Sequence, residues 1–246
     1  MNIKGILFDV NGTLINILTD EGMEEIFRAV SHFLTYQGID LHRGEVRDQY
    51  FRIMKEQTEA SGEEHPEFDA VALWREFLVR NLNGTCRPPV DKLQATARFL
   101  AEIYRGISRH RLELYPDVRS VLEDLKPRFS LAVVSDGQRV WALPEMRATG
   151  IDRYFDPIVI SSDFGFRKPD PRLFQIALDK IGAGPQEVLF VGNDMHRDVF
   201  GARNLGIKTV FFASNQGRHH MEGVEPDYII YRFSELREAV KFFERL

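Results

Sequence analysis

Four groups of polar side chains stand at or near the ends of predicted strands. They are Asp9, Ser135, Lys168 and the pair Asn193-Asp194, with Asp198 close behind. An aspartate can attack a phosphoryl group and form a covalent intermediate, and a second carboxylate beside it can help to hold Mg2+. A hydroxyl and an ammonium group can bind the remaining phosphoryl oxygens and offset their charge. Together, and in this order, these residue types indicate chemistry on a phosphoryl group.

The first group, at Asp9, follows a run of apolar residues. Residues 3–8 are mostly apolar with polar ends, which predicts a short strand buried on both faces. Gly12 permits a sharp turn soon afterwards. In open α/β sheets, ligands bind at the carboxyl ends of the strands. Taken alone, Asp9 could equally be a polar residue that ends the strand and caps the turn, so the other three groups decide between the two interpretations.

Strands alternate with helices from about residue 115 onward. This alternation is typical of βαβ units and predicts a parallel sheet, to which the first strand also belongs. Because the carboxyl ends of parallel strands meet at one edge, the four polar groups are expected to converge there. The predicted strands span residues 130–135, 157–160, 187–191, 207–212 and 228–230, and the predicted helices span residues 117–126, 171–182, 195–206 and the last dozen.

The stretch between the first strand and this region has a helical pattern instead. Apolar side chains recur at three-and-four spacing over residues 23–34, 46–54, 71–78 and 93–103. Four amphipathic helices with no strand between them predict a small helical bundle inserted into the α/β part. The aromatic residues of these helices are expected to form the core of the bundle rather than a binding site.

Composition places the chain among soluble globular proteins. Of its 246 residues, 43% are hydrophobic and 28% are charged, with a net charge of −5. This slightly acidic balance argues against nucleic acid or an anionic membrane as a partner. Cys86 is the sole cysteine, so an internal disulfide and a cysteine-based zinc site are excluded. With no membrane-length apolar run and no signal-peptide pattern, a cytoplasmic location is expected.

The four polar groups resemble the four motifs of the haloacid dehalogenase-like hydrolases, and the resemblance covers essentially the whole chain. The first motif matches residues 9–14, the second Ser135, the third residues 168–170, and the fourth residues 192–198 with Gly201-Ala202. The resemblance implies an α/β fold: a Rossmann-like parallel-sheet core, residues 1–16 and 113–246, and an inserted helical-bundle cap domain, residues 17–112. The implied activity is Mg2+-dependent hydrolysis of a small phosphorylated molecule through an aspartyl-phosphate.

The resemblance also implies roles for individual residues. The nucleophile would be Asp9, and the catalytic residues would be Asp9, Asn11 and Lys168. Substrate would be bound by Ser135, Asp136, Gly137 and Lys168. Mg2+ would be held by Asp9, the Asn11 carbonyl, Asn193 and Asp194, with Asp198 as a further candidate.

Three positions depart from the family pattern. Asn11 stands where family phosphatases carry a second aspartate, which protonates the leaving oxygen and later activates water. An amide cannot exchange a proton near neutral pH, and such acid–base catalysis contributes about 10²–10⁴-fold. Asp136 stands where the second motif usually has Asn, and adds negative charge near the expected phosphate. Asn193 replaces the usual acid of the fourth motif, which moves metal binding to Asp194 or weakens it.

These departures leave several activities open. The first is a phosphatase that is slow, or that takes acid–base help from the substrate, the cap or water. The second is a 2-haloacid dehalogenase, which attacks carbon and needs neither the second aspartate nor metal; the related phosphonate-cleaving branch would need a cap lysine such as Lys55. The third is an inactive scaffold that binds a phosphate ligand or a protein.

Some features of the sequence keep more than one interpretation. Asn11 could be an engineered change, and Asn11-Gly12 could deamidate to aspartate, which an intact-mass measurement would detect. His219 and His220 lie in a polar loop without a visible partner cluster, so no metal site is expected there. The physiological substrate and the oligomeric state are not assigned, because substrate choice depends on cap side chains that the sequence does not place.

Overall fold

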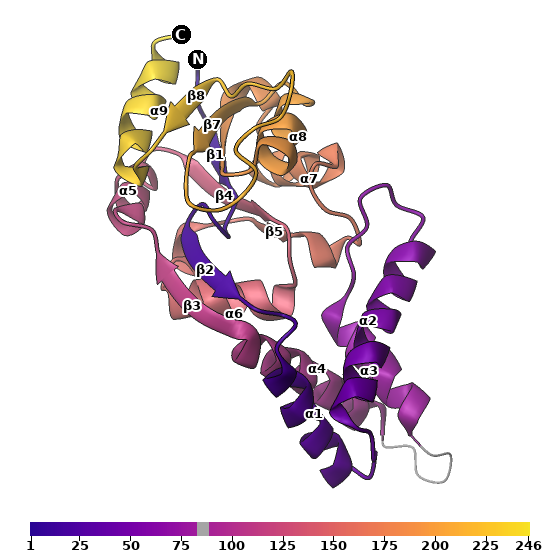
Figure 1. The fold of residues 1–246 in the computed structure, drawn as a ribbon. Coiled ribbons are helices and arrows are strands. Elements are labelled where there is room, and N and C mark those ends of the chain that lie inside the picture. Colours follow the sequence, from indigo (N-terminus) through magenta and orange to yellow (C-terminus); the bar gives the residue numbers. More distant parts are fainter. Residues whose placement is uncertain (83–88) are drawn as a thin grey trace.

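A six-stranded parallel sheet organises the larger part of the computed structural model, which describes residues 1–82 and 89–246 (Figure 1). Its strands are β1 (Gly5–Phe8), β4 (Ser130–Ser135), β5 (Ile158–Ile160), β6 (Val188–Gly192), β7 (Lys208–Phe212) and β8 (Tyr228–Ile230). They lie in the order β5-β4-β1-β6-β7-β8, so β1 is central, between β4 and β6. The α/β fold predicted from the sequence is confirmed. Cys86, the sole cysteine, lies outside the described residues.

The sheet is buried on both faces, as the apolar sequence of β1 predicts. Ile6 and Phe8 face one cluster of core side chains and Leu7 faces the other, and none of the three has exposed surface. Helices α5 (Val118–Leu125), α6 (Arg139–Ala148) and α9 (Leu236–Glu244) cover the first cluster, and α7 (Pro171–Ile181) and α8 (Gly201–Arg203) cover the second. Within the described ranges, no helix has the length and apolar character needed to cross a membrane.

Helix α6 has no counterpart among the elements predicted from the sequence. Its buried residues do not share one face, because Val140 and Trp141 pack into the helical bundle whereas Ala142 and Met146 pack onto the sheet. Pro144 also lies inside this helix. A helix that contacts two cores has no single apolar stripe, so its helical period is hidden in the sequence.

The predicted helical bundle is present beside the sheet and has a hydrophobic core of its own (Figure 1). Its helices are α1 (Glu24–Tyr36), α2 (Arg43–Ala60), α3 (Ala70–Asn81) and α4 (Val90–Ser108). Aromatic rings fill this core, and the ring centroids of Tyr50 and Tyr104 are 4.6 Å apart. Tyr104 also stacks on Trp141 of α6, with centroids 5.8 Å apart, so the bundle core continues onto the α/β part.

A two-stranded antiparallel ribbon joins the two parts of the molecule. β2 (Ile15–Thr19) pairs with β3 (Arg109–Leu114), and neither strand was predicted from the sequence. Four of the six residues of β3 are polar and none of the six is fully buried, which hides the strand from a search for apolar runs. The domain boundaries predicted from the sequence, between residues 16 and 17 and between residues 112 and 113, fall inside this ribbon. Because β2 begins soon after β1 ends, the helical bundle is attached close to Asp9.

Phe27 in α1 tests how strongly the bundle depends on its aromatic core. The Phe27 side chain is 1% exposed, so Phe27→Ala should lower the free energy of unfolding by about 3–5 kcal/mol through lost burial and a residual cavity. Tyr36→Ala in the same helix is the matched control, because Tyr36 is 84% exposed and its loss should change stability by no more than about 0.5 kcal/mol. Urea unfolding measures both, and equal stability of the two variants would contradict this packing.

Candidate active site

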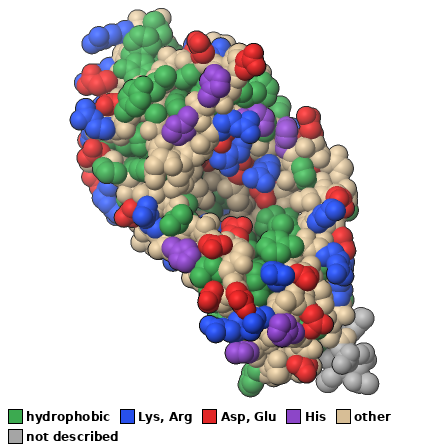
Figure 2. All heavy atoms as spheres, viewed as in Figure 1, with side chains coloured by type: hydrophobic (Ala, Val, Ile, Leu, Met, Phe, Trp, Pro, Cys, Tyr) green, Lys and Arg blue, Asp and Glu red, His purple; other side chains and the backbone are tan. Residues whose placement is uncertain are grey.

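The carboxyl ends of β1, β4 and β6 open into a cavity of about 630 Å³ between the sheet and the helical bundle. Figure 2 shows the hollow where the two parts meet, bordered by basic and acidic side chains. Five of the residues selected from the sequence line this cavity: Asp9, Asn11, Asp136, Gly137 and Asn193. The other four, Ser135, Lys168, Asp194 and Asp198, are buried and do not line it.

A buried lysine links two of the aspartates. Lys168 Nζ lies 2.7 Å from Asp9 Oδ1 and 2.7 Å from Asp198 Oδ1, and its side chain is 1% exposed. Burial opposes the charge on Lys168, but Asp198 and Asp9 outweigh that effect and raise the pKa of its ammonium group. The three side chains therefore form a charged triad, in which Asp9 is the member that reaches the cavity.

Thr13 and Gly12 fix the other side of Asp9. Thr13 Oγ1 lies 3.1 Å from Asp9 Oδ2 and 3.0 Å from Asn193 Oδ1. Gly12 has a φ of 88°, and a Cβ at this position would lie 2.2 Å from the Asn193 amide nitrogen. A side chain at residue 12 would therefore be strained and would push Asn193 away. The Gly-Thr turn that follows β1 thus brings the first and fourth sequence motifs into contact.

The two carboxylates of the fourth motif have different surroundings. Asp198 Oδ2 accepts hydrogen bonds from the backbone N–H groups of Asn193 and Asp194, both at 3.0 Å, which holds the end of β6 in place. Asp194 caps the π-helical segment Met195–Phe200 by accepting from the His196 and Arg197 N–H groups. Burial acts to raise the pKa of Asp194, but the N–H bond and the guanidinium of Arg197 outweigh it and lower that pKa.

The donor set limits where a divalent metal could bind. No group of three or more His, Cys, Asp and Glu side chains suited to a metal occurs within residues 1–82 and 89–246. Asp194 is already engaged by its N–H contacts and by the Arg197 guanidinium at 3.1 Å. Of the residues predicted to hold the metal, Asp9, Asn11 and Asn193 line the cavity, and they offer a carboxylate, a backbone carbonyl and an amide oxygen. Mg2+ is commonly held by one or two carboxylates together with water and substrate phosphate, and these three oxygens fit such a site.

Asp136 and Gly137 follow β4 at the edge of the cavity. Asp136 Oδ1 accepts from the Lys168 N–H at 2.9 Å, whereas Asp136 Oδ2 is buried without a hydrogen-bond partner. The nearest cations to Oδ2 are the guanidinium groups of Arg197, at 3.9 Å, and Arg167, at 4.0 Å. Ser135 ends β4, and its hydroxyl makes one long contact, 3.4 Å, to the Asp136 carbonyl. The Ser135 hydroxyl and Asp136 Oδ2 therefore keep hydrogen-bonding capacity.

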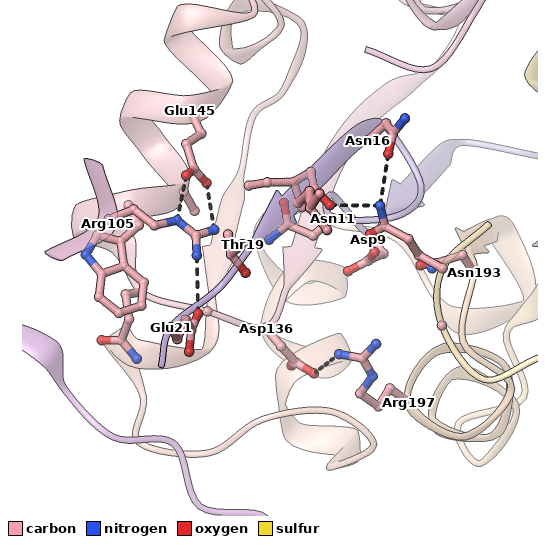
Figure 3. Close-up of a pocket in the computed structure, with 18 of the residues that line it drawn as sticks. Asp9, Asn11, Asn16, Thr19, Glu21, Arg105, Asp136, Glu145, Asn193 and Arg197 are labelled. Carbon is pink, nitrogen blue, oxygen red and sulfur yellow. Dashed lines mark hydrogen bonds and ion pairs between the residues drawn. The ribbon is translucent and has the colours of Figure 1, made fainter. Parts of the chain in front are cut away.

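Arg197 is a charged residue of the cavity that the sequence analysis missed. Burial opposes its charge, but Asp9, Asp194 and other aspartates around it outweigh burial and raise the pKa of the guanidinium. Figure 3 shows Arg197 beside Asp136 on one side of the cavity, with Arg105 and its partners on the other. Asp194 stands just before the predicted helix of residues 195–206 and Arg197 lies in its first turn, so their i,i+3 spacing was a signal for this pair.

The cap side of the cavity carries a second ion-pair cluster that the sequence analysis also missed. Arg105 of α4 donates to both carboxylate oxygens of Glu145 in α6, at 2.7 and 3.3 Å, and contacts Glu21 at 3.4 Å. The guanidinium also lies over the Trp141 ring, 5.3 Å from its centroid. This cluster ties α4 of the helical bundle to α6 of the α/β part, a contact that no sequence pattern indicated.

Three other residues singled out in the sequence analysis lie away from the cavity. Lys55 is 72% exposed, pairs with Glu59 at 3.5 Å, and does not line the cavity, so it is not placed to attack a substrate there. His219 and His220 are exposed, and the His219 ring lies 3.1 Å from the Gln216 carbonyl. Neither histidine belongs to a metal-binding cluster of the described residues.

The chain is similar to proteins of known family. A model of the haloacid dehalogenase-like hydrolase family matches residues 3–206. A relative from Methanopyrus kandleri, named glyceraldehyde 3-phosphate phosphatase, is 30% identical over 97% of both chains. A relative from Bacillus mycoides, named pyrophosphatase PpaX, is 32% identical over 96% of both chains. This chain therefore belongs to the haloacid dehalogenase-like hydrolases.

Solved structures share the whole architecture. The crystal structure of a 2-haloacid dehalogenase from Pseudomonas syringae pv. Tomato superposes with a TM-score of 0.69 and covers 98% of this chain and 99% of its own. The two sequences are 22% identical, a level at which the likeness demonstrates the common fold alone. The sheet and the inserted helices are thus those of the family.

Lys168 is the residue whose loss should cost the site most stability. Lys168→Met leaves Asp9 and Asp198 buried without their cation, which should lower the free energy of unfolding by about 3–5 kcal/mol at pH 7. The raised pKa of Lys168 means that its contribution is complete at any pH below its ordinary value, so pH 7 reports all of it.

Lys180→Met is the matched control, because Lys180 is exposed on α7 and its loss should cost no more than about 0.5 kcal/mol. Lys168 itself stays charged at lower pH, but the deficit of Lys168→Met should shrink as the pH falls, because burial raises the pKa of Asp198 and a protonated Asp198 no longer needs the cation. Urea unfolding at pH 7 and at pH 5 measures this, and a Lys168→Met protein as stable as Lys180→Met would contradict the triad.

Proposed function

We propose that this protein is a phosphatase that hydrolyses small phosphorylated molecules through a phosphoryl group carried on Asp9. The observation that carries the proposal is the 2.7 Å ion pair between Lys168 Nζ and Asp9 Oδ1 at the edge of the cavity. This pair holds one carboxylate oxygen and leaves Oδ2 with a single side-chain contact, from Thr13. A carboxylate oriented in this way is suited to act as a nucleophile.

The names of the relatives support a phosphorylated substrate. The Methanopyrus kandleri protein is named for glyceraldehyde 3-phosphate and the Bacillus mycoides protein for pyrophosphate. Both sequences align with nearly all of this chain, including the cap region that borders the cavity. The dehalogenase likeness rests on 22% identity, so it does not favour attack on carbon over attack on phosphorus.

In the proposed reaction, Asp9 Oδ2 attacks the phosphorus and the bond to the leaving oxygen breaks. Water then attacks the phosphoryl group on Asp9, and phosphate leaves. The Lys168 ammonium and the Arg197 guanidinium supply the positive charge that offsets the phosphoryl oxygens as charge develops on them. The Ser135 hydroxyl, which has only one long contact, is free to donate to one of those oxygens.

Mg2+ is the cofactor that this oxygen set favours. The Asp9 carboxylate, the Asn11 carbonyl and the Asn193 amide oxygen would hold it, and the ion would neutralise and align the phosphoryl group. Because this set contains a single carboxylate, we expect the metal to bind weakly in the absence of substrate. Binding should become tighter when the substrate phosphate adds its own oxygens. We therefore assign Asn193 rather than Asp194 as the metal ligand from the fourth motif, because Asp194 is held by Arg197.

Because residue 11 is asparagine, this site lacks the second aspartate that transfers the protons in family phosphatases. The Asn11 amide can position a substrate but cannot protonate a leaving oxygen or accept a proton from water. An alkyl leaving group needs that proton most, and without a donor its departure would be slower by about 10²–10⁴-fold. The proton must therefore come from the substrate, from water or from the cap.

Phosphate release from a panel of aryl, alkyl and acyl phosphates, with Mg2+ and with a chelator, tests the proposal. We expect release that depends on Mg2+, and Asp9→Ala should retain less than about one per cent of it, as is typical when a nucleophile is removed. Asp179→Ala, at an exposed position of α7, is the matched control and should keep full activity. Release that is unaffected by Asp9→Ala would rule out the phosphoaspartyl route.

A further inference from the structure

A buried glutamate of the cap lines the same cavity as Asp9. Glu67 lies between α2 and α3, is 9% exposed, and belongs to the cavity wall together with Asp9, Asn11 and Asp136. We propose that Glu67 is the proton donor and acceptor that Asn11 cannot be, so that the cap supplies the acid–base group of this site. This inference rests on the phosphatase function proposed above.

The loop that carries Glu67 is tied to the segment that leads into Lys168. The Glu67 N–H donates to the Gly165 carbonyl at 3.0 Å, and the Arg167 N–H donates to the His65 carbonyl at 2.9 Å. The cap loop and this core segment thus pair as neighbouring extended chains. Because Lys168 directly follows Arg167 and binds Asp9, this pairing ties the loop of Glu67 to the segment that holds the reacting group, on the wall of the same cavity.

Side chains of the core hold the Glu67 carboxyl group itself. Ser161 Oγ donates to Glu67 Oε2 at 2.7 Å, and Gln138 Nε2 donates to Oε1 at 3.1 Å. Ser161 Oγ also accepts from the Gly137 N–H at 2.8 Å, which links Glu67 to the end of the second motif. Each carboxyl oxygen has two lone pairs, so these contacts leave capacity for a substrate or a water molecule.

The charge environment distinguishes Glu67 from the other carboxylates of the cavity. Glu145 and Glu21 pair with Arg105, and Asp9 pairs with Lys168, whereas Glu67 forms no ion pair with any residue of the described ranges. Burial raises the pKa of Glu67; Asp136 adds to this effect, and Ser161 and Arg167 oppose it. A carboxyl group with a raised pKa can carry a proton nearer to neutral pH, as acid catalysis requires.

With Glu67 as acid and then as base, each proton that moves in the reaction has a donor and an acceptor. As Asp9 Oδ2 bonds to phosphorus, the bond from phosphorus to the leaving oxygen breaks. That oxygen takes the proton of the Glu67 carboxyl group and departs as an alcohol, and Glu67 becomes a carboxylate. In the second step, the carboxylate takes a proton from the attacking water, whose oxygen bonds to phosphorus as the Asp9 oxygen leaves. Glu67 and Asp9 are thereby restored.

The leaving group provides the test. Glu67→Gln keeps the shape of the side chain and one of its two accepting oxygens but cannot transfer a proton. With glyceraldehyde 3-phosphate, an alkyl ester, the rate of the first step, measured as release of the leaving group within one turnover, should fall by about 10²–10⁴-fold. With 4-nitrophenyl phosphate, whose leaving group needs no proton to depart, the fall of this first-step rate should stay within a few-fold. Adding Asn11→Asp to Glu67→Gln should restore turnover of the alkyl ester by at least about tenfold, because aspartate can transfer the proton.

Ser161→Ala is the control for a merely structural role. It removes the hydrogen bond at Glu67 Oε2 and keeps the acid, so it should lower turnover of both esters by a similar, smaller factor. Equal losses of the first-step rate for the two esters in Glu67→Gln, or no loss of that rate, would overturn the role of Glu67 while leaving the phosphatase intact. Absence of phosphate release from the wild-type protein with either ester would overturn the proposed function itself.

Discussion

A buried ammonium group between two carboxylates is the interaction on which the rest of this site depends. Lys168 compensates Asp9 and Asp198 in a position almost closed to solvent, where an unpaired charge would be strongly destabilising. Asp198 in turn accepts from the backbone N–H groups of the turn after β6, and Asp9 reaches Asn193 through Thr13. The triad therefore fixes both the direction of Asp9 and the shape of the loop opposite it.

The sheet and the cap contribute different parts of the same cavity. The carboxyl ends of the parallel strands supply the fixed charges, and the ribbon of β2 and β3 attaches the cap beside them (Figure 1). Two polar atoms of the strand-end loops, Asp136 Oδ2 and the Asn193 amide nitrogen, are buried without partners in the described structure. Leaving such atoms unpaired costs about 1–3 kcal/mol each, so a ligand that satisfied them would bind more tightly.

The sequence was informative where chemistry and local pattern coincide. The apolar run before Asp9 and the strand–helix alternation predicted the sheet, and the three-and-four spacing predicted the four bundle helices. The sequence did not predict α6, because this helix contacts two cores and has no single apolar stripe. It did not predict β3 either, because the residues of that strand are largely polar. Glu67 was missed because only its contacts with Ser161 and Gln138 distinguish it from any acid in a cap loop.

The central claim is that Asp9 carries the phosphoryl group during turnover. Mixing the enzyme with an acyl phosphate and Mg2+, quenching in acid within one turnover, and mapping the modified peptide by mass spectrometry tests this most directly. We expect one phosphoryl group per chain, located on Asp9 and lost when the quenched protein is treated with hydroxylamine. Phosphate release accompanied by a phosphoryl group on another residue, or without any phosphorylated enzyme during the turnover, would contradict the role of Asp9.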